Sequence, residues 1–219
     1  MTEPDMVSLR DQHIPDLSPE QEARRCYEIL SRRRSVRKFS NRPVSLETIE
    51  WLIRCATTSP SGSNKQPWRF VCIRTPELKR ELRIAAEEVE GEFYGGRANA
   101  EWLADLEKFG TDARKEFLEE APWLIVVFKQ IRDEDEGQVY YVNESVGIAV
   151  GLLLAAAQHA GLATLTHTPS PMSFLGGLLE RSENERPFLL IPIGYPADDC
   201  LVPACASLRK PLDEVMLVL

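Results

Sequence analysis

The sequence lacks the short motifs by which several large classes of enzyme are recognised. It has no G-x-G-x-x-G segment after an apolar run and no P-loop, so neither common nucleotide-binding fingerprint is present. It has no G-x-S-x-G nucleophile elbow. Its histidines, His13, His159 and His167, lie far apart, and none is paired with a recognisable nucleophile. No pair of carboxylates stands out as an acid and a base. The side chains alone therefore indicate little catalytic chemistry.

Cysteine is scarce, and its spacing matches no metal-binding pattern. An odd number of cysteines in a chain of this length also argues against a secreted disulfide framework. We therefore expect buried or surface thiols without a chemical role, and no metal site. The five residues are Cys26, Cys55, Cys72, Cys200 and Cys205.

No apolar run is long enough to span a bilayer. The first 19 residues are polar and contain no apolar signal-peptide region. The 34 acidic residues outnumber the 26 basic ones, and the formal net charge of −8 argues against a general nucleic-acid surface. Hydrophobic residues make up 43% of the chain, which is ordinary for a globular domain with a core. We expect a cytoplasmic protein that binds neither nucleic acid nor membrane.

Against this acidic background, a basic patch covers residues 33–39, in which Arg33, Arg34 and Arg37 surround Ser35. A guanidinium presents N–H donors in a fixed arrangement that suits a phosphate group. The patch is thus interpreted as an anchor for a phosphate-bearing cofactor. The alternative is a solvated basic helix end, because arginine and lysine favour the last turn of a helix. In a chain with little side-chain chemistry, phosphate anchors suggest that a cofactor carries the reaction.

Capping signals predict the first two helices. Ser18, Pro19 and Gln21 match an N-cap, a first-turn proline and a capping-box partner, and this helix should run to about Arg33. Ser45 precedes apolar positions at helical spacing up to about residue 56. The polar segment 57–68 then follows. Its small residues could let backbone N–H groups approach a planar ligand, or it could be a plain connecting loop.

Residues 87–116 have the composition of a mobile lid. A third helix from about residue 75 ends in a dense run of acids, and the glycine pair Gly95-Gly96 indicates a break before a further helix over about 99–119. The alternative interpretation is a solvated excursion of two helices.

The remaining pattern alternates buried strands with helices. Strands are predicted over 70–73, 123–128, 163–169 and 187–196, with a short helix over 171–179. The longest helix should cover residues 140–161, and its small residues suit either a partner helix from a second subunit or a position inside one domain. The apolar run 215–219 should pair with a sheet. We expect an N-terminal arm over 1–19 and a single domain over 20–219.

The chain resembles the FMN-dependent nitroreductase superfamily in four segments that occur in order. They are RRSVR at 33–37, SPSGSNKQPW at 59–68, Gly-Tyr-Pro at 194–196 and Arg-Lys-Pro at 209–211. Three more specific features resemble the iodotyrosine deiodinase branch of that superfamily. They are Glu90 four residues before Tyr94, RKEFLEEAP at 114–122 leading into FKQ at 128–130, and TLTHTP at 164–169.

The resemblance covers about residues 32–219 and implies a nitroreductase-like α+β fold. A central mixed, mostly antiparallel sheet would be flanked by helices in an intertwined homodimer, with FMN at the subunit interface. The C-terminal extension, about 200–219, would reach the partner subunit. The implied reaction is reductive loss of halide from mono- and diiodotyrosine by one-electron steps from reduced FMN, giving tyrosine and iodide. NAD(P)H would supply electrons directly or through a reductase. The membrane anchor of mammalian members is missing, which implies a soluble, bacterial type.

The resemblance also assigns the substrate contacts. Glu90, Tyr94 and Lys115 would hold the zwitterion of a halotyrosine, and the backbone N–H of Ser63 would bind the phenolate. The physical chemistry agrees, because a free amino acid needs an anion for its ammonium and a cation plus a donor for its carboxylate. Glu90 and Tyr94, four residues apart, share one helical face.

The implied FMN contacts fall into three groups. The basic patch and Arg209 would bind the phosphate and ribityl side, Ser61 and Gly62 would lie against the ring, and Thr166 would bond flavin N5 and favour one-electron steps. His167 replaces a threonine of mammalian members, although its backbone could still serve. The full set is Arg33, Arg34, Ser35, Val36, Arg37, Ser61, Gly62, Thr166, His167, Thr168 and Arg209. Two alternatives remain open: an NAD(P)H-dependent nitroreductase or flavin/quinone reductase, and a non-catalytic flavin- or ligand-binding protein.

Overall fold

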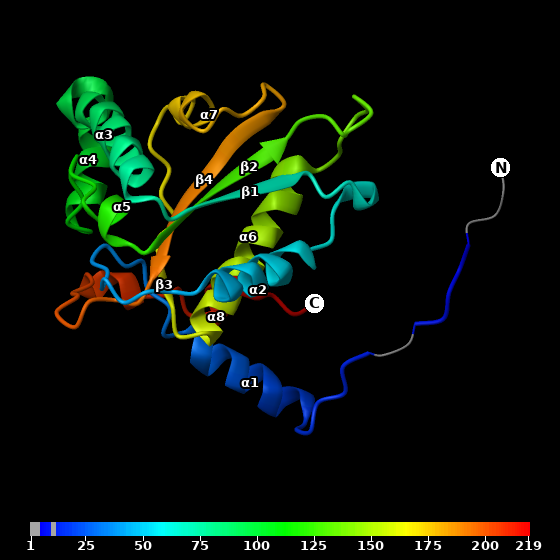
Figure 1. The fold of residues 1–219 in the computed structure, drawn as a ribbon. Helices are drawn as coiled ribbons and strands as arrows, with labels where there is room; N and C mark the ends of the chain where they lie inside the picture. Colours follow the sequence, from blue (N-terminus) through cyan, green and yellow to red (C-terminus); the bar gives the residue numbers. More distant parts are fainter. Residues whose placement is uncertain (1–4, 10–11) are drawn as a thin grey trace. The chain divides into compact units, whose positions relative to one another are not determined.

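The computed structural model describes residues 5–9 and 12–219, and the chain forms two compact units, Met1–Arg32 and Arg33–Leu219. Part of the expected N-terminal arm, residues 1–4 and 10–11, lies outside the described residues. Helix α1 (Pro19–Leu30) belongs to the first unit (Figure 1). It begins at the predicted capping box, in which Ser18 Oγ accepts from the Gln21 N–H and Gln21 Oε1 accepts from the Ser18 N–H. It ends three residues before Arg33, because the chain turns at Ser31.

The second unit is built on a four-stranded sheet with the strand order β1-β2-β4-β3. The strands are β1 (Trp68–Ile73), β2 (Trp123–Gln130), β3 (Ala163–Thr164) and β4 (Glu185–Gly194). All of these pairs are antiparallel, and a parallel bridge joins Ser35 to Thr164. The antiparallel character expected of the sheet is confirmed, and the parallel part of the expected mixed sheet is limited to that isolated bridge.

Strand β2 divides the core into two layers. Side chains alternate between the two faces of a strand. Trp123, Ile125 and Val127 pack with α2 (Leu46–Thr57) and α6 (Val142–His159). Their neighbours Leu124, Val126 and Phe128 pack with α3 (Pro76–Glu92), α5 (Phe117–Glu120) and α7 (Phe174–Leu178). Figure 1 shows α2 and α6 beside one another, apart from α3 and α5. The central strand is therefore apolar on both faces, which explains its unbroken hydrophobic run.

Several local predictions are confirmed. Ser45 caps α2 by accepting from the Thr48 N–H at 3.1 Å. The glycine pair falls in a short π-helix, η2 (Phe93–Arg97), where Gly96 has a φ of 150° that favours glycine. The long helix predicted over 140–161 is present as α6, and Gly161 beyond its end has a φ of 72°, as is usual for a glycine that ends a helix.

Two predicted elements are shorter than expected. The helix expected over 99–119 is two helices, α4 (Ala100–Glu107) and α5, because the chain turns at Gly110 with a φ of 59°. The strand expected over 163–169 is reduced to β3 and one isolated bridge between His167 and Leu190. Beyond Thr164 the segment stays hydrogen-bonded to β4 through the backbones of Leu165 and His167, and it also lines the wall of a cavity.

The C-terminal prediction is wrong within this chain. Residues 215–219 pair with no strand among the described residues, and their side chains are exposed. Val215 is the last residue of a one-turn helix, α8 (Leu212–Val215). Two 3₁₀ turns are also present, η1 (Gly62–Asn64) and η3 (Ala204–Ser207). None of the helices in the described part of the chain combines the length and apolar character needed to cross a membrane.

The cysteines are all free. Cys26 and Cys55 are exposed, and the other three are partly buried. Burial raises the pKa of Cys72 to about 11, so this thiol is not ionised near neutral pH. No group of three or more potential metal ligands occurs within residues 5–9 and 12–219.

Candidate functional site

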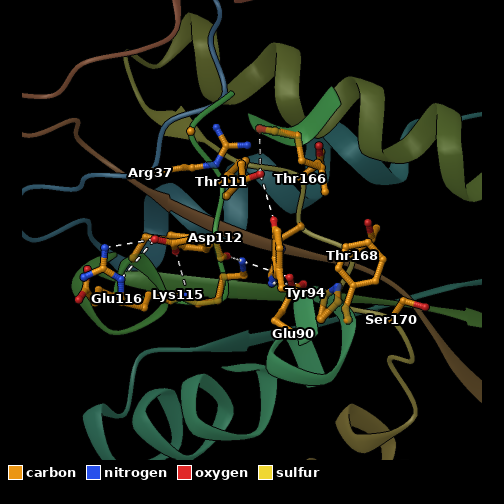
Figure 2. A pocket seen from close by; sticks show the side chains of 18 of the residues that line it. Arg37, Glu90, Tyr94, Thr111, Asp112, Lys115, Glu116, Thr166, Thr168 and Ser170 are labelled. Carbon is orange, nitrogen blue, oxygen red and sulfur yellow. Dashed lines mark hydrogen bonds and ion pairs between the residues drawn. The ribbon is translucent and has the colours of Figure 1, made fainter. Parts of the chain in front are cut away.

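A cavity of about 660 Å³ opens between the C-terminal end of α3, residues 110–117, and residues 165–172 (Figure 2). Three segments that are distant in sequence thus converge on one space large enough for a small aromatic molecule. Seven of the predicted site residues line its wall together. They are Arg37, Glu90, Tyr94, Lys115, Thr166, His167 and Thr168.

A buried ion pair joins two walls of this cavity. Glu90 Oε2 lies 3.2 Å from the ammonium nitrogen of Lys115, and the two side chains are only 11% and 6% exposed. Glu90 comes from the last turn of α3, whereas Lys115 comes from the segment that returns toward β2. Buried charges are costly unless they are paired, so each of these residues requires the other when no ligand is present.

The backbone of Lys115 is held by a further residue of α3. Glu87 Oε1 accepts the Lys115 backbone N–H at 2.7 Å. The Lys115 ammonium also donates to the backbone carbonyl of Asp112. Glu87 is linked through Arg83 to Glu119 of α5, since Arg83 lies 3.8 Å from Glu87 and 3.1 Å from Glu119. The cation is therefore fixed at both its backbone and its ammonium.

Tyr94 lies beside the ion pair of Glu90 and Lys115. Its hydroxyl is 3.1 Å from Thr111 Oγ1, and its ring lies 5.5 Å from the Lys115 ammonium. Phe93 packs edge-on against Tyr94 and against Trp102 of α4. The aromatic cluster joins η2 to α4, so the position of Tyr94 depends on both.

His167 adds a neutral polar group to the same wall. Its Nε2 lies 4.0 Å from Glu90 Oε1, and no hydrogen bond to this buried nitrogen is found among the described residues. Burial, followed by the nearby charges of Lys115 and Arg37, lowers the pKa of His167 to about 3. The imidazole is therefore uncharged at neutral pH. Its ring packs edge-on against Phe117.

A second cavity, of about 440 Å³, adjoins the first and carries the basic groups. Arg37 and Thr166 line both cavities, while Ser35 and Arg209 line the second. Burial lowers the pKa of Arg33, and the charges of Arg209 and Arg34 lower it further. Cations that repel one another in this way form a ready site for an anion such as a phosphate.

The loop residues predicted to contact a planar ligand do not lie at either cavity. Ser61, Gly62 and Ser63 line neither cavity and pack against the N-terminal end of α6, where Gly62 N–H donates to Ser145 Oγ. A Cβ on Gly62 would lie 2.7 Å from the Tyr140 carbonyl oxygen, which explains the glycine. Ser63 has a φ of 51°, which is uncommon for a non-glycine residue.

Three other predicted residues also stay outside the cavity walls. Arg33 and Arg34 line neither cavity, and Val36 is buried in the core with its N–H bonded to the Thr164 carbonyl. The sequence reasoning missed Glu87 and Thr111. Glu87 lies three residues before Glu90 and so on the same helical face, a spacing that could have identified it. Thr111 carried no comparable signal.

Comparison with known proteins gives a consistent set of relatives. The nitroreductase family model matches residues 30–195. An iodotyrosine deiodinase from Haliscomenobacter hydrossis is 54% identical over 196 residues, covering 88% of this chain and 87% of the relative. Iodotyrosine deiodinase 1 from Homo sapiens is 42% identical over 216 residues, covering 96% and 74%. A crystal structure of oxidized iodotyrosine deiodinase bound to FMN and 3-iodo-L-tyrosine aligns with a TM-score of 0.74 at 32% identity, covering 85% of this chain and 95% of that one.

Proposed function

Because the chain belongs to the nitroreductase family, we propose that it is an FMN-dependent iodotyrosine deiodinase, which removes halide from halotyrosines by reduction. The observation that carries the proposal is the buried pair of Glu90 and Lys115 beside Tyr94. One anion and one cation on facing walls match the two charges of a free amino acid. A general reductase of neutral aromatic compounds would have no need for such a pair.

The residues present fit FMN. Burial, and then the charges of Arg209 and Arg34, lower the Arg33 pKa, and a flavin phosphate would offset that repulsion, with Arg209, Arg37 and Ser35 as further partners. Thr166 is exposed and lines both cavities, so its hydroxyl suits a hydrogen bond to the flavin ring. When bound, FMN supplies the two electrons of the reaction. The net change replaces the carbon–halogen bond by a carbon–hydrogen bond, consuming two electrons and one proton and releasing halide.

The chain's own residues bind and orient the substrate in this proposal. Glu90 receives the ammonium of the halotyrosine, and Lys115 with the Tyr94 hydroxyl receives its carboxylate. The ligand thus replaces one internal ion pair by two intermolecular ones, and no buried charge is left alone. The backbone N–H of Ser63 would stabilise the phenolate, and Ser61 and Gly62 would lie against the flavin ring. All three would come from a partner subunit, since in this chain they line neither cavity.

We further propose a homodimer with a single domain over residues 20–219. Helix α6 supports the homodimer, because it has a face on which a partner helix could pack. Gly147 and Gly151 have open space beyond their Cα atoms, and Ile148 between them is 47% exposed. The C-terminal extension, about residues 200–219, would reach the partner subunit, and its exposed apolar run, 215–219, would pack there. Residues 87–116 would form the lid over the active site. Electrons would come from NAD(P)H, directly or through a reductase. Light scattering coupled to gel filtration tests the dimer, and a chain that stays monomeric with FMN bound would contradict it.

Ligand binding tests the function. The purified protein with FMN should bind 3-iodotyrosine at least about a hundredfold more tightly than 2-iodophenol, because only the former offers two charges to the pair. Quenching of flavin fluorescence measures both. Under strong reductant, the protein should release iodide from 3-iodotyrosine. Equal, weak binding of both ligands together with NAD(P)H-driven reduction of nitroaromatics would instead identify a general nitroreductase.

A further inference from the structure

His167 is not among the groups that hold the amino-acid part of the substrate in the proposal above. Its Nε2 nevertheless faces that position. The atom is buried, lies 4.0 Å from Glu90 Oε1, and has no hydrogen bond among the described residues, while His167 is one of the residues that line the cavity. A buried polar atom without a partner is uncommon and needs an explanation.

The two oxygens of Glu90 have different surroundings. Oε2 is 3.2 Å from the Lys115 ammonium, while Oε1 faces His167. The 4.0 Å gap is too long for a hydrogen bond between Oε1 and Nε2. It does suit two acceptors that share one donor group, because atoms each about 2.9 Å from a single ammonium nitrogen can lie roughly 4 to 5 Å apart.

The charge state of the ring agrees with an acceptor. Burial, together with the neighbouring cations Lys115 and Arg37, lowers the His167 pKa to about 3. In a neutral imidazole one nitrogen carries the proton and the other accepts. The edge-on packing on Phe117 and the bridge between the backbones of His167 and Leu190 fix the direction of the ring.

We infer that His167 is a substrate-binding residue whose unprotonated Nε2 accepts a hydrogen bond from the ammonium group of the halotyrosine, which Glu90 Oε1 also binds. This inference rests on the proposed function. It makes the ammonium subsite a pair of acceptors, one charged and one neutral. A primary ammonium group, with several N–H donors, satisfies both at once.

Three matched ligands isolate the ammonium. They are 3-iodotyrosine, 3-iodotyramine, which lacks the carboxylate, and 3-(4-hydroxy-3-iodophenyl)propionate, which lacks the ammonium. His167→Phe keeps an aromatic ring against Phe117 and removes the nitrogen. It should weaken binding of both ammonium ligands roughly tenfold or more, and binding of the propionate less than about twofold. Calorimetry on the FMN-loaded protein measures these constants, with exposed His159→Phe as the control variant.

His167→Gln separates the acceptor from packing. Its side-chain amide can place an oxygen near the position of Nε2, so it should restore affinity for 3-iodotyrosine to within a few-fold of wild type. Equal weakening of all three ligands by His167→Phe, or unchanged affinity for 3-iodotyrosine, would overturn the inference. A wild-type protein that binds 3-iodotyrosine no better than the propionate would instead overturn the proposed function.

Nitrogen NMR of the wild-type protein keeps the inference testable if the phenylalanine variant does not fold. With only three histidines, ¹⁵N-labelled imidazoles can be assigned individually. 3-Iodotyrosine should shift the unprotonated Nε2 resonance of His167, and the propionate should leave it in place. A resonance unchanged by 3-iodotyrosine, or the same shift with both ligands, would contradict the proposed bond.

Discussion

The carboxylate of Glu87 accepts a 2.7 Å hydrogen bond from the backbone N–H of Lys115. One turn later on the same helix, Glu90 pairs with the ammonium of that lysine. Helix α3 thus holds both ends of the cation that is proposed to bind the substrate carboxylate. The arrangement makes Glu87 a positioning residue without requiring that it touch the ligand.

Replacing Glu87 by Ala should therefore weaken binding of ligands that carry a carboxylate. The expected loss is roughly tenfold, as for a hydrogen bond to a charged group worth about 1.5 kcal/mol. Binding of 2-iodophenol should not change. Flavin fluorescence titration measures both, and exposed Glu88→Ala on the same helix is the control. An equal loss for both ligands would indicate general damage to the cavity instead.

Breaking the Glu90–Lys115 pair from one side should cost more than removing both charges. Each of Glu90→Gln and Lys115→Met leaves one buried charge uncompensated, so each should lower the free energy of unfolding by about 3 to 5 kcal/mol. The double variant should lose clearly less free energy of unfolding than the two single variants lose together. Urea unfolding at neutral pH with a fixed excess of FMN gives all four values. Additive losses would show that the two charges do not depend on one another.

Arg209→Gln should affect the protein in opposite directions with and without FMN. With FMN, the loss of a phosphate-binding guanidinium should weaken cofactor affinity about tenfold or more. Without FMN, removing Arg209 relieves the repulsion that, after burial, lowers the Arg33 pKa. The hydrogen bonds lost with Arg209 are exposed local ones to the carbonyls of Ala206 and Leu208, so the melting temperature should stay the same or rise. Retained flavin and thermal melts report these effects, with exposed Lys210→Gln as the control. A lower melting temperature without FMN would argue against the proposed repulsion.

Stability should fall on mild acidification because of His167. Its folded-state pKa of about 3 lies below the ordinary value near 6.5, so between these values the unfolded chain binds a proton that the native protein does not. The stabilisation is complete above about pH 6.5 and is lost as the pH falls, by about 2 kcal/mol at pH 5. Urea unfolding at pH 5 and pH 7 should show this loss in wild type, a smaller loss in His167→Gln, and the wild-type loss in His159→Gln. An identical pH dependence in all three proteins would show that His167 does not cause the loss of stability.

The elements that sequence could predict are those set by local chemistry. Ser18 and Ser45 cap helices because their side chains accept nearby N–H groups, and the apolar run of β2 is long because both of its faces are buried. The break between α4 and α5 was missed because the apolar residues on either side of the turn at Gly110 keep a helical spacing. Local pattern could not reveal that residues 215–219 pair with no described strand of their own chain.

The site was predictable as a set of residues but not as an arrangement. Family resemblance named Glu90, Tyr94 and Lys115, and the fold brings them to one cavity. It gave no sign that Glu90 and Lys115 would pair with each other, since that contact depends on how α3 meets the segment returning to β2. The placement of Ser61, Gly62 and Ser63 away from both cavities likewise depends on packing against α6.

The two-faced burial of β2 also determines how the protein can open. One strand supplies side chains to both helical layers, so neither layer of the second unit can unfold and leave the other intact. The amide protons of β2 should therefore exchange with solvent only through global unfolding, whereas those of η2 and α4, which contribute little to the core, can exchange through local opening. If η2 and α4 form the proposed lid, their local opening would admit substrate without disturbing the rest of the second unit.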